Sequence, residues 1–223
     1  MAQRPRREGS FRERLKVFVL RSVLFNVWRL AERLGIRLGT EGPTYAPTDA
    51  QREAMDALVV GARAGGGVID ASSTGFPAHE LLTHLAVQHG LLLHGTNNTE
   101  LEVLKPQPAR DFGTHVEVVA AADDGIWPLF YAVVARQHVE GVFTACMHLG
   151  RVPRLRRFYM FRVFGADPHK ETTWTHGAVY AVQRAEFWRE WGNEWLRGTE
   201  VTPVLRVLVR PSDFPLRHVV ASR

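Results

Sequence analysis

The stretch Leu91-Leu92-Leu93-His94-Gly95-Thr96-Asn97 decides how the centre of this chain folds. Three consecutive leucines are typical of a strand buried on both faces, and the histidine and glycine that follow mark its end. A buried strand holds a polar ring in one fixed place, and a glycine allows another group to approach the backbone closely. The stretch therefore predicts either a ligand site at the strand end or a histidine that simply satisfies a hydrogen bond there.

Helices are expected before this strand and further strands after it. Thr48 and Gln51 form a capping box that predicts a helix to about residue 64, where three glycines end it, and Pro77 predicts the start of a second helix over residues 78–89. An apolar helix is expected over residues 126–136. Short β-branched or aromatic segments predict strands at residues 68–70, 116–121, 158–164, 178–182, 194–196 and 204–209. Because βαβ alternation is missing, the fold class is α+β rather than a doubly wound parallel sheet.

Charge divides the chain into a basic arm and a nearly neutral body. Residues 1–40 hold ten Arg and Lys against three acidic residues, and the remainder holds eighteen against twenty. Apolar residues at helical spacing predict an amphipathic helix over residues 10–34, which packs on the domain or a partner or else binds an anionic membrane surface. Residues 41–67 are expected to be a linker and helix, and residues 68–223 the main domain. A body without excess positive charge disfavours nucleic acid as a partner.

Other features of the sequence narrow the function classes. The single cysteine, Cys146, cannot form an internal disulfide, which favours the cytoplasm. No uncharged run is long enough to span a membrane, and neither a phosphate-binding loop nor a serine-hydrolase elbow is present.

Two clusters of residues suggest binding sites but have simpler explanations. Histidines recur every five residues, which sets neighbours about 140° apart around a helix, so surface or helix-end histidines and no metal site are expected. The second cluster consists of arginines and is expected to be a solvated loop. The histidines are His79, His84, His89 and His94, and the arginines are Arg151, Arg154, Arg156 and Arg157.

A carboxylate far along the chain completes a pattern. Glu194 opens an expected strand and is followed by Trp195-Leu196; Glu200 is the competing acid, and a plain surface glutamate remains the alternative. Together with His94-Gly95-Thr96, this order of elements resembles the ADP-ribosyltransferase-like superfamily. It is most similar to a group of uncharacterised bacterial proteins that share Leu-Leu-His-Gly-Ser/Thr-Asn. The resemblance covers residues 70–210, including Leu104-Lys105-Pro106 and Gly177-Ala178-Val179-Tyr180. It also includes Pro211-Ser212-Asp213-Phe214-Pro215, directly after this range.

The resemblance implies a split, mostly antiparallel β core that binds NAD or a related nucleotide. His94 would bond the ribose, the Gly95 backbone would hold the nicotinamide amide, Thr96 would complete this cofactor site, and Glu194 would be the catalytic carboxylate. Transferases stack nicotinamide on a tyrosine of the strand before the aromatic helix. This chain has Val118-Val119-Ala120-Ala121 there, so Tyr131, Trp127 or Tyr180 would take that role. The implied activity is transfer of ADP-ribose to an acceptor protein. The alternative is a catalytically silent domain of the same fold that binds a protein or a membrane surface.

Overall fold

The computed structural model describes residues 19, 23, 26–31, 33–36, 39–111, 114–149 and 156–222. Three α-helices and twelve strands follow one another from Thr40 onward in this part of the chain, with short 3-10 turns between them. The helices are α2 (Asp49–Ala64), α3 (Ala78–Val87) and α4 (Trp127–Val133). The strands are β1 (Thr40–Glu41), β2 (Val68–Asp70), β3 (Leu92–Thr96), β4 (Gln107–Asp111), β5 (Thr114–Ala122), β6 (Gly141–Leu149), β7 (Arg156–Phe164), β8 (Gly177–Val182), β9 (Trp188–Trp191), β10 (Glu194–Arg197), β11 (Leu205–Val209) and β12 (Ala221–Ser222).

The strands form two sheets. The larger has eight strands, in the order β2-β11-β8-β3-β5-β10-β9 with β4 also paired to β5, and the smaller has β1, β7 and β12 in line with β6 paired to β7. Among the pairs described, β2 with β11 and β7 with β12 are parallel, and the others are antiparallel. The predicted α+β class is therefore confirmed.

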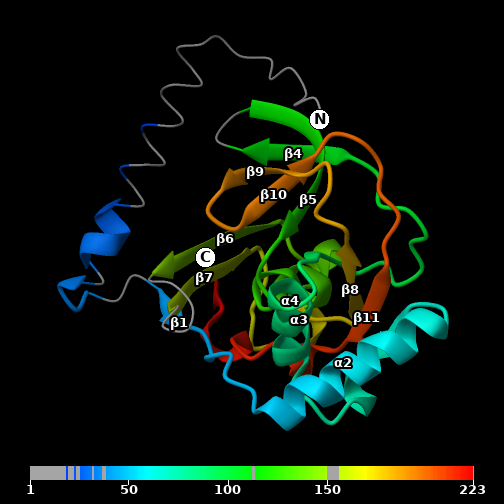
Figure 1. The fold of residues 1–223 in the computed structure, drawn as a ribbon. Helices are drawn as coiled ribbons and strands as arrows, with labels where there is room; N and C mark the ends of the chain where they lie inside the picture. The colour runs from blue at the N-terminus through cyan, green and yellow to red at the C-terminus, as the bar shows by residue number, and fades with distance from the viewer. Residues whose placement is uncertain are drawn as a thin grey trace.

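Helix α4 lies between the two sheets (Figure 1). On one side its Phe130 ring packs against Phe161 of β7, with 4.8 Å between ring centroids. On the other side its backbone rests on Gly95 of β3 and Gly177 of β8, where a Cβ would come far inside 3.0 Å of a helix carbonyl oxygen. Two small residues on adjacent strands thus form a seat that lets the helix approach the sheet closely.

Core side chains cover both faces of the larger sheet. Leu93 belongs to the cluster beneath α3 and α4, whereas Leu92 belongs to a second cluster on the opposite face with Tyr180 and Val182. Burial on both faces explains why the strand is a continuous apolar run instead of an alternating one.

Helix α2 belongs to the same core. The capping box at Thr48 and Gln51 is present as predicted, and Gly65 follows its last residue. Met55 and Val59 are fully buried in the main cluster, so the segment expected to be a linker and helix contributes directly to the domain's core.

Several sequence predictions need correction or lie outside the described residues. Strands β1, β4, β6, β9 and β12 were not predicted. Most of the predicted helix 10–34 lies outside the described residues, including Phe18 and Phe25, as do Arg151 and Arg154. Residues 26–31 are helical, with Trp28 half-buried. In the described part of the chain, no helix has the length and apolar character needed to cross a membrane.

Candidate functional site

The larger sheet splits immediately after Leu93. Leu93 is opposite Ala122 of β5, and this is the one register pair between β3 and β5 in the described residues. Beyond it, the His94 ring takes the place of a ladder bond, because its Nδ1–H donates to the carbonyl oxygen of Ala120 across 2.7 Å. The predicted hydrogen bond of His94 is therefore present, but the predicted end of the strand at this residue is wrong, because β3 continues to Thr96 and stays paired with β8.

Its environment keeps the His94 ring neutral. Burial lowers the pKa of His94 below 6.5, although the bond to Ala120 acts in the opposite direction. Since the carbonyl oxygen of Ala120 can only accept, Nδ1 carries the proton of the neutral ring and Nε2 keeps its lone pair. Among the described residues no side chain or backbone group bonds Nε2. The ring therefore offers one hydrogen-bond acceptor, suited to a hydroxyl group.

The residues after His94 hold helix α4. Gly95 supports its backbone, and Asn97 donates through Nδ2 to Ala132 O at 2.9 Å and accepts from the Arg136 backbone N–H at 3.2 Å. The Thr96 hydroxyl accepts from the Asn98 backbone N–H at 3.2 Å. The close approach predicted at Gly95 is therefore made by the protein's own helix on that face of the strand.

Glu194 lies one strand further across the sheet. It opens β10 and is opposite Ala122, the residue that Leu93 faces from the other edge of β5. Two interstrand spacings thus separate the backbones of Leu93 and Glu194, which corresponds to about 10 Å. Side chains of directly opposed residues share a face, so Glu194 lies on the Leu93 and α4 face, while His94, opposite Tyr180, starts from the other face.

Tyr131 lies on the Glu194 side of the split. Its hydroxyl bonds Thr144 Oγ1 of β6 at 2.7 Å, and Trp127, one turn earlier on α4, donates from Nε1 to the same oxygen at 2.9 Å. Burial raises the pKa of Tyr131, the Thr144 bond lowers it, and the Glu194 charge raises it. The Arg136 guanidinium lies 5.7 Å from the Tyr131 ring centroid. Tyr131 and Glu194 are therefore electrostatic neighbours, whereas no aromatic ring contacts His94 within the described part of the chain.

A buried anchor that the sequence did not reveal fixes the start of α4. Asp124 is fully buried and accepts from the backbone N–H groups of Ile126 and Trp127 at 2.8 and 2.7 Å. Its second oxygen accepts from the Tyr159 hydroxyl at 2.6 Å and lies 3.5 Å from Arg157 Nη1. The expectation of a solvated arginine cluster is therefore wrong for Arg157, whose side chain is 7% exposed. The sequence does hold a signal for this burial, because Arg157 directly precedes the aromatic residues Phe158 and Tyr159 of the same strand.

Two of the five-residue-spaced histidines meet at one carboxylate. His84 and His89 donate from Nε2 to Asp56 Oδ1 at 2.7 and 2.8 Å. The expected surface position is wrong for His84, which is fully buried. The helical-angle argument does not apply to His89, because α3 ends at Val87.

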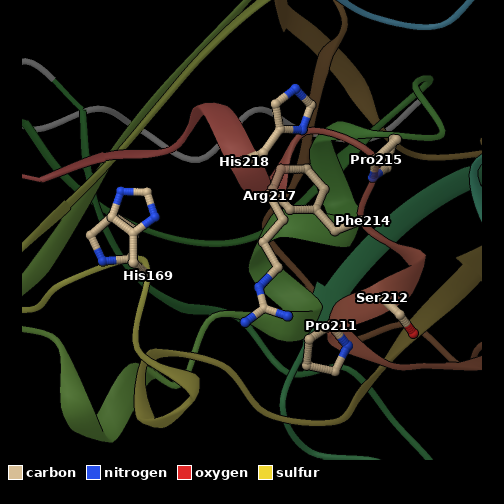
Figure 2. A pocket seen from close by; sticks show the side chains of 8 residues that line it. His169, Pro211, Ser212, Phe214, Pro215, Arg217 and His218 are labelled. Atoms are coloured by element: carbon tan, nitrogen blue, oxygen red, sulfur yellow. The ribbon is translucent and has the colours of Figure 1, made fainter.

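Two pockets formed by described residues lie elsewhere. One of about 290 Å³ adjoins the Pro-Ser-Asp-Phe-Pro stretch (Figure 2), and Arg217 at its edge is already ion-paired with Glu171. A second, of about 700 Å³, lies beside β1 and β7. Neither His94 nor Glu194 lines either of them.

Comparison with known proteins gives no relative: no family model, no curated protein and no solved structure matches the chain.

Proposed function

We propose that this chain is an ADP-ribosyltransferase-like protein that binds NAD or a related nucleotide and transfers ADP-ribose to an acceptor protein. The observation that carries the proposal is the end of pairing between β3 and β5 after Leu93, with His94 on one strand of the split and Glu194 two strands away from β3. The backbones of Leu93 and Glu194 are separated by two interstrand spacings, about 10 Å, with β5 between them, so one nucleotide would have to reach both sides of the split. The compartment proposed for this reaction is the cytoplasm, in keeping with the free Cys146.

Each residue has a role in this reaction. The lone pair of His94 Nε2 accepts from a ribose hydroxyl, the backbone of Gly95 and Thr96 holds the nicotinamide amide, and the Tyr131 ring covers the nicotinamide. The bond from ribose C1′ to nicotinamide breaks, and nicotinamide leaves with the electron pair. The acceptor nucleophile then bonds C1′ and loses its proton. Glu194 stabilises the positive charge of the oxocarbenium-like transition state.

Nicotinamide release from NAD by the full chain tests the catalytic part of this proposal. Glu194→Gln removes the charge and keeps the shape, so we expect release to fall by about 10²-fold or more. The matched control is Glu200→Gln, because Glu200 is the exposed acid just beyond β10. Equal loss in both variants, or no NAD turnover by wild type, would rule out catalysis through Glu194.

A catalytically silent domain of the same fold is the second candidate, and one observation favours it. Alternation along β3 starts His94 on the face opposite Glu194, and α4 occupies the face above Gly95. A site that binds a nucleotide through His94 without using Glu194 would show NAD affinity without turnover.

The N-terminal helix offers such a silent domain a binding surface. Val19, Val23, Val27, Leu30 and Leu34 are exposed and follow one another at steps of three or four residues. On the helix predicted over residues 10–34, this spacing gives one apolar stripe in a basic arm, as in helices that lie on anionic membranes. Co-sedimentation with vesicles of anionic lipid, lost on deletion of residues 1–36 and absent with neutral lipid, is the expected result. Unchanged sedimentation after the deletion would contradict the membrane role.

A further inference from the structure

Helices α2 and α3 bring two imidazoles and a carboxylate together on the domain. Asp56 comes from α2, His84 from the last turn of α3, and His89 from the residues just after α3. Their ligand atoms all lie within 4.8 Å of one another. We propose that Asp56, His84 and His89 form a Zn²⁺ site.

The chemistry of the three side chains suits zinc. Imidazole nitrogen together with one carboxylate oxygen is a common donor set for Zn²⁺, whereas Ca²⁺ and Mg²⁺ prefer oxygen alone. Bonds of about 2.0–2.1 Å in tetrahedral geometry hold ligand atoms about 3.3 Å apart. The nitrogen-to-oxygen distances of 2.7 and 2.8 Å therefore need to widen by only about half an ångström.

The surroundings of His84 supply the support that zinc-binding histidines usually have. The Tyr45 hydroxyl lies 2.8 Å from His84 Nδ1 and is able to donate or accept. In the metal-free neutral ring, Nε2–H donates to Asp56 and Nδ1 accepts from Tyr45. With zinc on Nε2, the ring's proton resides on Nδ1 and donates to the Tyr45 oxygen. Such a partner fixes the tautomer and the orientation of a zinc ligand.

Exposure and helix polarity favour an accessible cation here. His84 is fully buried, but the side chains of His89 and Asp56 are 21% and 51% exposed, so zinc can enter from solvent and keep a water as fourth ligand. The C-terminal end of α3 adds the partial negative charge of the helix dipole. The proposed zinc site connects α2 to α3. It shares no residue with the proposed nucleotide site.

Calorimetry of the metal-free full chain with ZnCl₂ tests the proposal. We expect one Zn²⁺ per chain, no heat with CaCl₂, and a rise in Tm of roughly 5–10 °C at about 100 times Kd. His89→Gln and Asp56→Asn each remove one ligand at an exposed or partly exposed position and should weaken Kd by at least about 100-fold. Tyr45→Phe keeps all three ligands and should weaken it by about 10- to 100-fold.

The control variant is His176→Gln, because His176 is exposed and lies outside the cluster. Co²⁺ in place of Zn²⁺ gives a readout that does not depend on stability, since a tetrahedral Co²⁺ site absorbs visible light strongly. Loss of that absorption in His89→Gln with retention in His176→Gln supports the site. The proposal is overturned if wild type binds no zinc, or if His89→Gln and Asp56→Asn bind it as tightly as wild type does.

Discussion

His94 donates its Nδ1–H to the carbonyl oxygen of Ala120 across 2.7 Å, at the point where β3 and β5 stop pairing. The His94 side chain thus bonds a carbonyl group of β5 where the backbone pairing of β3 with β5 has ended. Its Nε2 remains as a hydrogen-bond acceptor for a ligand. If the role of His94 is structural, its ring only satisfies the carbonyl oxygen of Ala120. If the role is functional, Nε2 of the same ring also binds a ribose hydroxyl. The bond to Ala120 is present in both cases.

The low pKa of His94 gives the stability of the protein a pH dependence. Because the folded-state pKa lies below 6.5, the unfolded chain binds more protons between the two values, and stability falls as pH drops below about 6.5. His94→Gln removes this contribution. Urea unfolding of both proteins at about pH 7.5 and about pH 5.5 should show the wild-type advantage shrinking at the lower pH. A constant difference would mean that His94 titrates alike in both states.

The seat of α4 predicts a costly glycine substitution. Gly95→Ala places a Cβ against the carbonyl oxygen of Pro128, a backbone atom that moves only with the helix. We expect a loss of about 2 kcal/mol or more in the free energy of unfolding. Gly61→Ala is the matched control, because nothing lies within 4 Å of that site in α2. The control should gain up to about 1 kcal/mol from helix propensity. Equal effects of the two substitutions in urea unfolding would refute the close packing.

The buried Asp124–Arg157 pair should be sensitive to the loss of one charge. Asp124→Asn leaves the Arg157 guanidinium buried without its carboxylate and should destabilise the protein by about 3–5 kcal/mol. Glu41→Gln, which weakens the exposed pair of Glu41 with Arg156, should cost less than about 1 kcal/mol. Thermal unfolding of the two variants separates these outcomes, and a small effect at Asp124 would show that Arg157 is not held as described.

Cys146 should be unreactive in the folded protein. Burial raises the pKa of its thiol well above 9.0, and Asn193 donates to its sulfur at 3.2 Å. Since the thiolate is the reactive form, iodoacetamide should label native protein far more slowly than protein in urea. Mass spectrometry reads this directly because the chain has one cysteine. Equal labelling rates in the two conditions would contradict the raised pKa of the thiol.

The fold class and the main elements could be predicted because local signals decide them. The Thr48–Gln51 capping box and the leucines at 91–93 each act over a few residues, and the structure has a helix after the first and a buried strand from Leu92 onward. Edge strand β4, by contrast, has the sequence Gln-Pro-Ala-Arg-Asp, which shows no apolar alternation. Its pairing with β5 therefore depends on tertiary context that a local pattern does not contain.

The site was predictable only where neighbouring residues define it. The place of His94 on a buried strand follows from its own neighbours, but the face on which Glu194 lies depends on its register with Ala122, which spacing along the chain does not reveal. The meeting of His84 and His89 was missed for a similar reason. Their common partner, Asp56, lies on another helix, and the end of α3 at Val87 frees His89 from helical geometry.

Titration of the full chain with NAD in a calorimeter tests the central claim, that the split beside His94 is a nucleotide site. Wild type should bind one NAD per chain. Glu194→Gln should bind with unchanged Kd, and His94→Ala, its fold checked by circular dichroism, should bind up to about tenfold more weakly, since one hydrogen bond to the ribose is lost. No binding by wild type, or identical Kd values in wild type and His94→Ala, would contradict the claim.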